Sequence, residues 1–298
     1  MEPQVEILGS DTPRRDRAPT IRKLIPSIGA AVHGVDLSAL DQRTFAVVYQ
    51  AWLEHTVLLF RDQHLSDADL AALGRRFGDL DPAPLDEYGR MFVAGYPEVC
   101  VISNVVENGN PIGSLGAAES AWHNDMTYFP RPPKMCALYG LEVPATGGNT
   151  GFLSTYRAFE TLPAELRRRA LTLTIKHDAA HNSAGGRRKG FAPVSDVTMS
   201  PGAVHPMVIT NPDSGRQALY LGRRPFAYVP GLRIAESEAL LDELWAHTGK
   251  QPNWHHQWRP GDLLMWDNRA CLHRRDGFAP ESRRVMHRIQ VNGGVPVA

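Results

Sequence analysis

The sequence predicts a mainly β protein in which a few helices pack on the outside of one β-rich core. Short apolar runs bounded by turn residues recur along the chain, which is typical of strands joined by turns. Only a few segments show the spacing of an amphipathic helix. The length of 298 residues allows one large β-rich domain or two smaller ones, and we find no internal repeat and no low-complexity linker.

The first hundred residues are predicted to hold two helices among short strands. Asp41 is a suitable N-cap for a helix over residues 41–54. Ser66 opens a second helix over residues 66–77, and Asp69 three positions later gives a pattern that resembles a capping box. Short strands joined by turns are expected within the weakly alternating residues 21–38, and single strands at residues 57–60 and 98–103.

Two loops and most of the strands are predicted further along the chain. Residues 104–120 are rich in glycine, asparagine and serine, and loops of this kind often carry substrate contacts. Residues 181–202 are glycine-rich and basic without clear periodicity, so we interpret them as a mobile loop or lid. The remaining predictions are a helix at 156–173 with a break near Pro163, a helix at 235–248, a hairpin-like pair at 204–209 and 217–221, and strands at 135–143, 254–258, 263–266 and 286–292.

The composition is that of an ordinary soluble protein. Lys and Arg together number 32, as do Asp and Glu, so the net charge gives no reason to expect a nucleic-acid or membrane partner. We find no signal peptide and no run of about 20 apolar residues, and residues 1–18 have the polar composition that is common in disordered tails. Three cysteines without a CxxC motif argue against a disulfide framework and favour a cytoplasmic location.

His123 and Asp125 are candidate metal ligands. On an extended strand, residues two apart point to the same face, so the two side chains can reach one point in space. A second imidazole from His273 would complete two histidines and one carboxylate, the set that holds non-heme Fe(II) and leaves coordination positions open. Taken alone, however, the two residues are more simply interpreted as a hydrogen-bonded surface pair.

Two arginines near the end of the chain predict an anionic ligand. Alternation along a strand places Arg284 and Arg288 on one face. Because a buried charge is costly without a partner, these guanidinium groups must be solvated, paired with acids or bound to an anion.

Four ordered segments resemble those of a known family. They are residues 122–128 (WHNDMTY), 144–150 (PATGGNT), 266–269 (WDNR) followed by His273, and 283–288 (RRVMHR). In order and rough spacing they resemble the taurine dioxygenase family of Fe(II)/2-oxoglutarate-dependent oxygenases over about residues 20–293. Within that family, residues 78–85, 95–99 and 151–154 are similar to the aryloxyalkanoate (phenoxy-herbicide) dioxygenases.

The resemblance implies a double-stranded β-helix, a cupin-like jelly roll, formed as a single domain by residues 19–298. It also implies that Fe(II) is held by His123, Asp125 and His273. Arg284 would bind the distal carboxylate of 2-oxoglutarate through the two-pronged hydrogen bonding that suits a guanidinium, and Thr150 would donate to the same carboxylate. O2 would be the second co-substrate, and the products would include succinate and CO2.

The resemblance further implies an oxidoreductase that hydroxylates a small, anionic organic molecule, with Arg288 facing its acidic group. Hydroxylation beside a heteroatom would cleave a C–O, C–S or C–N bond. Ala83 stands where taurine-cleaving members carry a histidine, so taurine is not the expected substrate. The residues expected around the substrate are Ala83, Leu85, Trp122, Met126 and Tyr128.

Two other functions stay open. The same chemistry serves tailoring oxygenases of natural-product biosynthesis, which hydroxylate, desaturate or cyclise amino-acid-like substrates. A jelly-roll protein could also hold a metal without turnover, although the complete ligand set and Arg284 argue against this. Members of the family form homodimers or homotetramers, so a homo-oligomer is expected.

Overall fold

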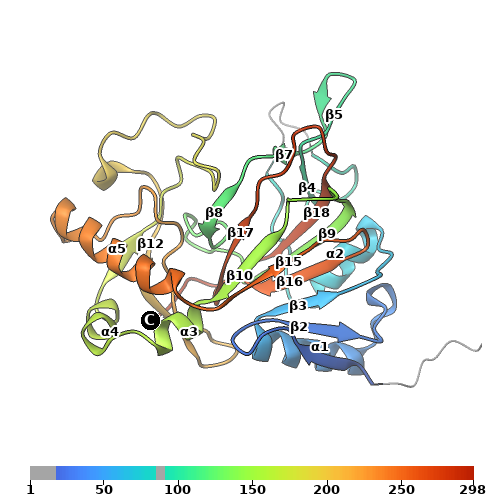
Figure 1. The fold of residues 1–298 in the computed structure, drawn as a ribbon, viewed down its shortest axis with the longest axis horizontal. Helices are drawn as coiled ribbons and strands as arrows, with labels where there is room; N and C mark the ends of the chain where they lie inside the picture. The colour runs from blue at the N-terminus through green and yellow to red at the C-terminus, as the bar shows by residue number, and fades with distance from the viewer. Residues whose placement is uncertain (1–17, 85–90) are drawn as a thin grey trace, which may run out of the picture.

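The structure is a computed structural model that describes residues 18–84 and 91–298, shown as a ribbon in Figure 1. The predicted tail lies almost wholly outside the described residues, as does Leu85. Among the residues described, no helix is both long enough and apolar enough to cross a membrane.

Two facing β-sheets form the core and confirm the predicted jelly roll. An eight-stranded sheet has the order β1-β2-β3-β16-β9-β18-β4-β7, and a four-stranded sheet has the order β15-β10-β17-β8. Residues of both sheets pack in one buried cluster, in which Phe152 of the small sheet meets Trp266 of the large one at 5.6 Å between ring centroids. The large sheet comprises β1 (Thr20–Lys23), β2 (Ala30–His33), β3 (Val57–Phe60), β4 (Cys100–Ser103), β7 (Ser114–Leu115), β9 (Met135–Glu142), β16 (Leu263–Asp267) and β18 (Val285–Val291); the small sheet comprises β8 (Ser120–His123), β10 (Thr150–Ser154), β15 (Asn253–His256) and β17 (Cys271–Arg275).

Helices α1 (Gln42–His55) and α2 (Asp67–Arg75) cover the outer face of the large sheet (Figure 1). Both begin as predicted, since the Asp41 side chain accepts from the backbone N–H of Thr44 and Ser66 forms a capping box with Asp69. Strand β3 shows how the sheet separates its two faces: Leu58 and Phe60 pack beneath the helices, whereas Val57 and Leu59 face the small sheet.

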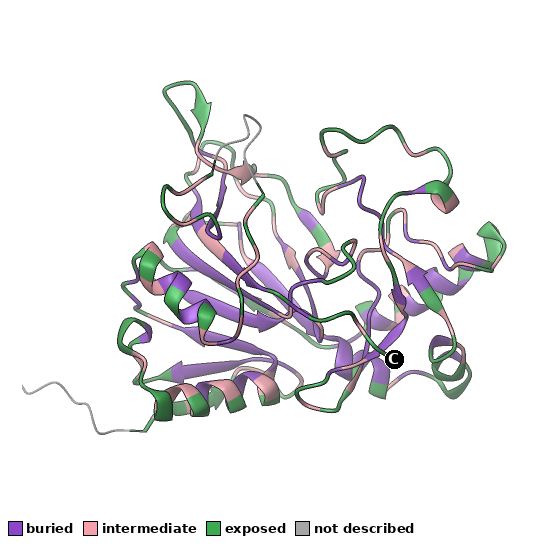
Figure 2. Ribbon diagram, turned by 180° about the vertical axis from the view of Figure 1, so that it is seen from behind, coloured by how far each residue is buried: buried purple, intermediate pink, exposed green. Residues whose placement is uncertain are grey.

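The chain between β10 and β15 builds a separate layer at one end of the sheets. Its apolar side chains form their own buried cluster, which Figure 2 shows as purple segments beneath green, exposed loops. The predicted break at Pro163 is confirmed, because one helix ends before it and the next begins directly after it. The elements of this layer are α3 (Thr155–Glu160), α4 (Ala164–Ala170), β11 (Thr174–Lys176), the 3-10 helix η2 (Val197–Met199), β12 (Val204–Pro206), β13 (Val208–Thr210), β14 (Gln217–Leu219) and α5 (Ile234–Gly249).

The structure differs from the predicted elements in three respects. Residues 204–209 are not one strand, because β12 pairs with β11 and only β13 forms the expected hairpin with β14. Strands β10, β11 and β17 were not predicted. The expected loop at 104–120 contains the hairpin of β5 (Val106–Glu107) and β6 (Asn110–Pro111), followed by β7, which pairs with β4. Residues 181–202 are irregular, as predicted, apart from η2.

Candidate active site

Strands β8 and β17 bring the two predicted histidines together. In the antiparallel register His123 lies directly opposite His273, and their ring centroids are 4.2 Å apart. Residues directly opposite on paired strands project to the same face. Residues separated by 150 positions in the sequence therefore present their imidazoles side by side.

Asp125 lies beside the two histidines, but a turn carries it and not the strand that the sequence predicted. Strand β8 ends at His123, and Asp125 lies in the following turn, so the prediction of one extended strand is wrong. Asn268 clamps this turn: its side-chain oxygen accepts from the backbone N–H of Asp125 at 2.7 Å, and its amide donates to the carbonyl of Asp125 at 2.8 Å. The next residue, Met126, has a φ of 56°, which lies in the left-handed region and turns the chain after Asp125.

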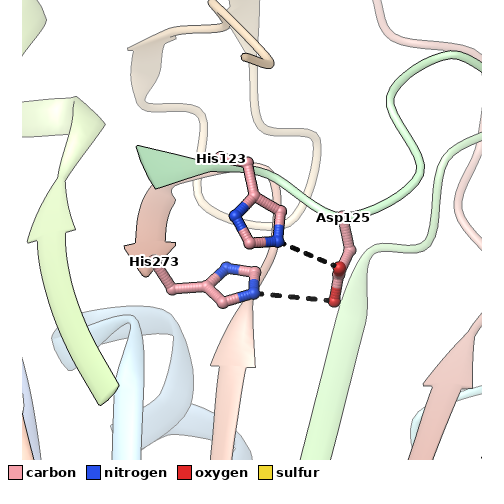
Figure 3. A group of neighbouring side chains, drawn as sticks. All are labelled: His123, Asp125 and His273. Carbon is pink, nitrogen blue, oxygen red and sulfur yellow. Dashed lines mark ion pairs between the residues drawn. The ribbon is translucent and has the colours of Figure 1, made fainter. Parts of the chain in front are cut away.

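The three side chains form a compact cluster (Figure 3). One ligand atom from each lies within 4.8 Å of the others. His123 Nε2 is 3.6 Å from Asp125 Oδ1, and His273 Nε2 is 3.9 Å from Asp125 Oδ2. His123 Nδ1 lies 2.7 Å from the carbonyl of Ala121, which favours the tautomer with the proton on Nδ1 and the lone pair on Nε2.

The protonation states suit a divalent metal. Burial, together with the nearby His123, lowers the pKa of His273 to about 3, so this imidazole is neutral. Burial alone would raise the pKa of the Asp125 carboxyl, but the positive charge of Arg288 holds it well below its usual range. Two imidazoles and one carboxylate are the donor set that suits Fe(II), so the residues fit the metal that the resemblance implied.

Arg284 is buried in a cavity that the three candidate ligands also line. Only 2% of its surface is exposed, its Nε has no hydrogen-bond partner, and no carboxylate among the residues described forms an ion pair with it. Burial, with the positive charge of Arg275 nearby, lowers its pKa to about 9. A cation in such surroundings is stabilised by an anionic ligand.

Thr150 supplies a hydrogen-bond donor to the same cavity. Its Oγ1 accepts from the indole N–H of Trp258 at 3.0 Å, which leaves the hydroxyl proton free to point elsewhere. Because Thr150 and Arg284 both line the cavity, a carboxylate there can accept from both side chains.

The cavity joins these groups into one site of about 290 Å³. It is lined by the three candidate ligands, by Thr150 and Arg284, and by Arg288, whose Nη1 lies 3.5 Å from Asp125 Oδ1. Met126 and Tyr128 also line it, as predicted.

Two predicted substrate contacts lie elsewhere. Neighbouring residues on a strand point to opposite faces, so Trp122 projects away from His123. Its ring lies beside His255 and beneath the Arg274 guanidinium, and it does not line the cavity. Ala83 packs against the core between the sheets, while its neighbour Pro84 lines the cavity. The structure therefore does not place Trp122 or Ala83 at the cavity, and Leu85 lies outside the described residues.

Several cavity residues were not predicted as functional. They include Arg188 and Arg223, together with His177, Asp178 and Arg275. Asn268 was also missed, although it lies within the WDNR segment that carried part of the resemblance. Its role depends on a turn that is distant in the sequence, so no local pattern revealed it.

Asn268→Ala is expected to lower metal affinity by roughly 10–100-fold, because it removes the clamp that orients Asp125. It should also destabilise the protein by about 1–3 kcal/mol, since buried backbone groups lose their partners. Anaerobic metal titration and urea unfolding measure the two effects. Asn292→Ala, which removes a surface hydrogen bond to Asp81, is the matched control. Unchanged metal affinity in Asn268→Ala would show that Asp125 does not need the clamp.

Comparison with known proteins agrees with this geometry. The profile described as "Taurine catabolism dioxygenase TauD, TfdA family" matches residues 20–290. The chain is 32% identical over 291 residues to a (S)-phenoxypropionate/alpha-ketoglutarate-dioxygenase of Sphingobium herbicidovorans, covering 92% of this chain and 94% of that protein. It is 31% identical over 283 residues to a pentalenolactone F synthase of Streptomyces arenae, covering 88% and 91%.

A solved structure shows the same likeness in three dimensions. The crystal structure of AAD-2 in complex with Mn(II) and N-oxalylglycine superposes with a TM-score of 0.74 at 27% identity. The match covers 95% of this chain and all of the other (100%).

A jelly roll that gathers two histidines, a carboxylate and a buried arginine in one cavity defines an Fe(II)- and 2-oxoglutarate-dependent dioxygenase. The chain belongs to the taurine catabolism dioxygenase (TauD, TfdA) family. The predicted enzyme class, with Fe(II) as metal and 2-oxoglutarate and O2 as co-substrates, is thereby confirmed.

Proposed function

We propose that this enzyme oxidises a small, anionic organic molecule at a metal held by His123, Asp125 and His273. The observation that carries the proposal is that the buried Arg284 and the largely buried Arg288 line the same cavity as these three side chains. Bound Fe(II) would supply the activation of O2 that couples decarboxylation of 2-oxoglutarate, to succinate and CO2, with oxidation of a substrate C–H bond.

Residues of this chain would hold the distal end of the 2-oxoglutarate molecule. Arg284 is positioned to bind the distal carboxylate of 2-oxoglutarate through two parallel N–H donors, and Thr150 would add its hydroxyl. Their burial excludes water from this end of the cavity, which strengthens both interactions.

Arg288 would bind the acidic group of the primary substrate. Its guanidinium lies beside Asp125, at the edge of the candidate metal site, so a bound anion would hold the adjacent carbon close to the metal. Hydroxylation next to a heteroatom then releases the two fragments of a C–O, C–S or C–N bond. The (S)-phenoxypropionate dioxygenase that resembles this chain supports a carboxylic acid as substrate.

A tailoring oxygenase is the second candidate. The similarity to a pentalenolactone F synthase supports oxidation within a biosynthetic route, by hydroxylation, desaturation or cyclisation. A metal-binding protein without turnover is not supported, because the relatives are enzymes and the ligand set is complete.

Anaerobic addition of Fe(II) and 2-oxoglutarate tests the proposed assignment of the site. The metal–co-substrate chelate is expected to give a weak visible charge-transfer band, which should be lost in His273→Ala. The same band in wild type and in His273→Ala would contradict the assignment. A screen of organic acids coupled to succinate release would then separate a catabolic enzyme from a tailoring oxygenase.

Arg288→Gln is expected to weaken binding of the primary substrate by roughly 10–100-fold, because a charged hydrogen bond is worth about 1.5–3 kcal/mol. The 2-oxoglutarate requirement should change far less. The measurement is the KM of each compound, using the substrate that the screen identifies. Arg283→Gln is the control, since this neighbouring arginine pairs with Glu142 and Glu107 at the surface. A larger effect on 2-oxoglutarate than on the substrate would overturn the role of Arg288.

The remaining assignments are also proposals. We propose a single catalytic domain over residues 19–298 in a cytoplasmic enzyme that assembles as a homodimer or homotetramer, without nucleic-acid or membrane partners. The family resemblance supports the domain and the oligomer. The three cysteines, Cys100, Cys136 and Cys271, are free and buried, which supports a reducing compartment.

A further inference from the structure

The cavity has a second basic wall besides Arg284 and Arg288. This wall is formed by the segment 181–184 and by Arg188 and Arg223. It belongs to the layer between β10 and β15, whereas Arg284 and Arg288 belong to the segment around β18. The substrate space is therefore bordered by arginines from two different parts of the fold.

The positively charged side chain of Arg188 lines the cavity. Its guanidinium carbon lies 4.0 Å from the centroid of the Tyr128 ring, and Tyr128 itself lines the cavity. Within the described part of the chain, no carboxylate forms an ion pair with Arg188, whereas Arg223 donates to Asp178 at 2.7 Å. The two arginines therefore differ: Arg223 is already paired with Asp178, whereas Arg188 can bind a ligand.

The loop that carries Arg188 is anchored at its base. The backbone N–H of Arg188 donates to the carbonyl of Ala180 at 2.7 Å. The buried Asp178 accepts from Ser200 Oγ at 2.5 Å and from His181 Nδ1 at 3.0 Å, besides Arg223. These bonds tie the base of the loop to the layer beneath it.

Arg188 and Arg288 line the same cavity. Arg188 lies over the Tyr128 ring, and Arg288 lies beside Asp125. Burial raises the pKa of the Tyr128 phenol, while the positive charges of both arginines act on it in the opposite direction. Arg288 already has Asp125 at 3.5 Å, but Asp125 would share its charge with the metal.

The charges of the filled site do not balance. Bound Fe(II) and the two carboxylates of 2-oxoglutarate cancel each other in formal charge. Among the described residues, the cavity is lined by the guanidinium groups of Arg188, Arg223, Arg284 and Arg288 and by the two carboxylates of Asp125 and Asp178. The excess of positive charge is larger than a substrate with one acidic group would neutralise.

We propose that Arg188 binds a second anionic group of the primary substrate, so that the enzyme acts on small organic dianions with acidic groups at both ends. One acidic group would lie at Arg288 and the other, a carboxylate or sulfate, at Arg188 above Tyr128. This inference rests on the proposed function, since it extends the substrate site next to the candidate metal centre.

Matched pairs of probe compounds test the proposal. The probes are phenoxyacetate with 4-carboxyphenoxyacetate, hexanoate with adipate, and phenyl sulfate with 4-carboxyphenyl sulfate. Each is titrated by anaerobic calorimetry into protein loaded with Fe(II) and 2-oxoglutarate, for wild type, Arg188→Gln and Arg187→Gln. Arg187 is the matched control because it lies on the same loop with the same charge, but is exposed and does not line the cavity.

At least one dianion is expected to bind wild type about tenfold or more tightly than its monoanionic partner, as suits a charge-assisted hydrogen bond. The preference should shrink to less than about twofold in Arg188→Gln and persist in Arg187→Gln. Three results would overturn the proposal: no preference in wild type for any pair, a preference that survives in Arg188→Gln, or an equal loss in Arg187→Gln.

The proposed function is tested separately in the same samples. The visible band of the Fe(II)–2-oxoglutarate complex is recorded before any probe is added. A missing band contradicts the proposed site, whereas a normal band without an Arg188-dependent preference contradicts the second anion site alone.

Discussion

Asp125→Ala is expected to abolish Fe(II)-dependent turnover. The carboxylate is the sole anionic member of the candidate ligand set, and its loss leaves two imidazoles beside the Arg288 cation, which repels a metal ion. The backbone of the turn is held by Asn268 and does not depend on the carboxylate, so the chain should still fold. Anaerobic Fe(II) titration and succinate release measure the effect, and circular dichroism checks the fold.

A second variant separates loss of the ligand from loss of stability. Removing the carboxylate leaves the largely buried Arg288 without its partner, which destabilises the folded state. Asp125→Asn keeps the volume of the side chain and should also lose turnover, with a smaller change in its unfolding midpoint. Substantial activity in either variant would remove Asp125 from the ligand set.

Arg284→Ala is expected to raise the 2-oxoglutarate requirement by roughly tenfold to more than a hundredfold, because a charged hydrogen-bond pair contributes about 1.5–3 kcal/mol or more. The dissociation constant of 2-oxoglutarate is measured anaerobically from the charge-transfer band. Pyruvate has no distal carboxylate, so its weaker binding should be nearly the same in wild type and in the variant.

The surface arginine next to it gives the control. Arg283 has half of its side chain exposed and pairs with Glu142 at 2.6 Å, so Arg283→Ala should bind 2-oxoglutarate as wild type does. If Arg284→Ala also binds it normally, the distal carboxylate lies elsewhere. If Arg284→Ala weakens the binding of pyruvate as much as that of 2-oxoglutarate, Arg284 acts on the metal-binding end of the co-substrate instead.

The elements that were predicted are those whose signal is local. The helix starts at Asp41 and Ser66 follow from capping chemistry within three or four residues, and the structure shows both caps. Strands β10 and β17 are buried along almost their whole length, so they lack the alternation that marks a half-exposed strand. The pairing of β12 with β11 instead of β14 depends on tertiary contacts that no local pattern records.

The candidate site was predicted by residue type more successfully than by geometry. The identities of His123, Asp125 and His273 followed from the chemistry of the ligand set, and the structure brings the three together. The strand that was expected to carry Asp125 ends two residues earlier, because Asn268, distant in the sequence, stabilises a turn. The same strand geometry sends Trp122 to the opposite face.

Arg188 shows the limit of sequence reasoning most clearly. Its loop has no periodicity, and a basic segment rich in glycine is most simply interpreted as solvated. Its place in the cavity depends on a backbone hydrogen bond to the carbonyl of Ala180 and on stacking over Tyr128, which only the folded chain shows.

A crystal structure of this protein grown anaerobically with Mn(II) and N-oxalylglycine tests the central claim most directly. The two compounds stand in for Fe(II) and 2-oxoglutarate without allowing turnover. The metal is expected about 2 Å from His123 Nε2, His273 Nε2 and one oxygen of Asp125. The distal carboxylate of N-oxalylglycine should be held by the Arg284 guanidinium and the Thr150 hydroxyl. A metal bound away from these three side chains, or a distal carboxylate that does not contact Arg284, would contradict the account.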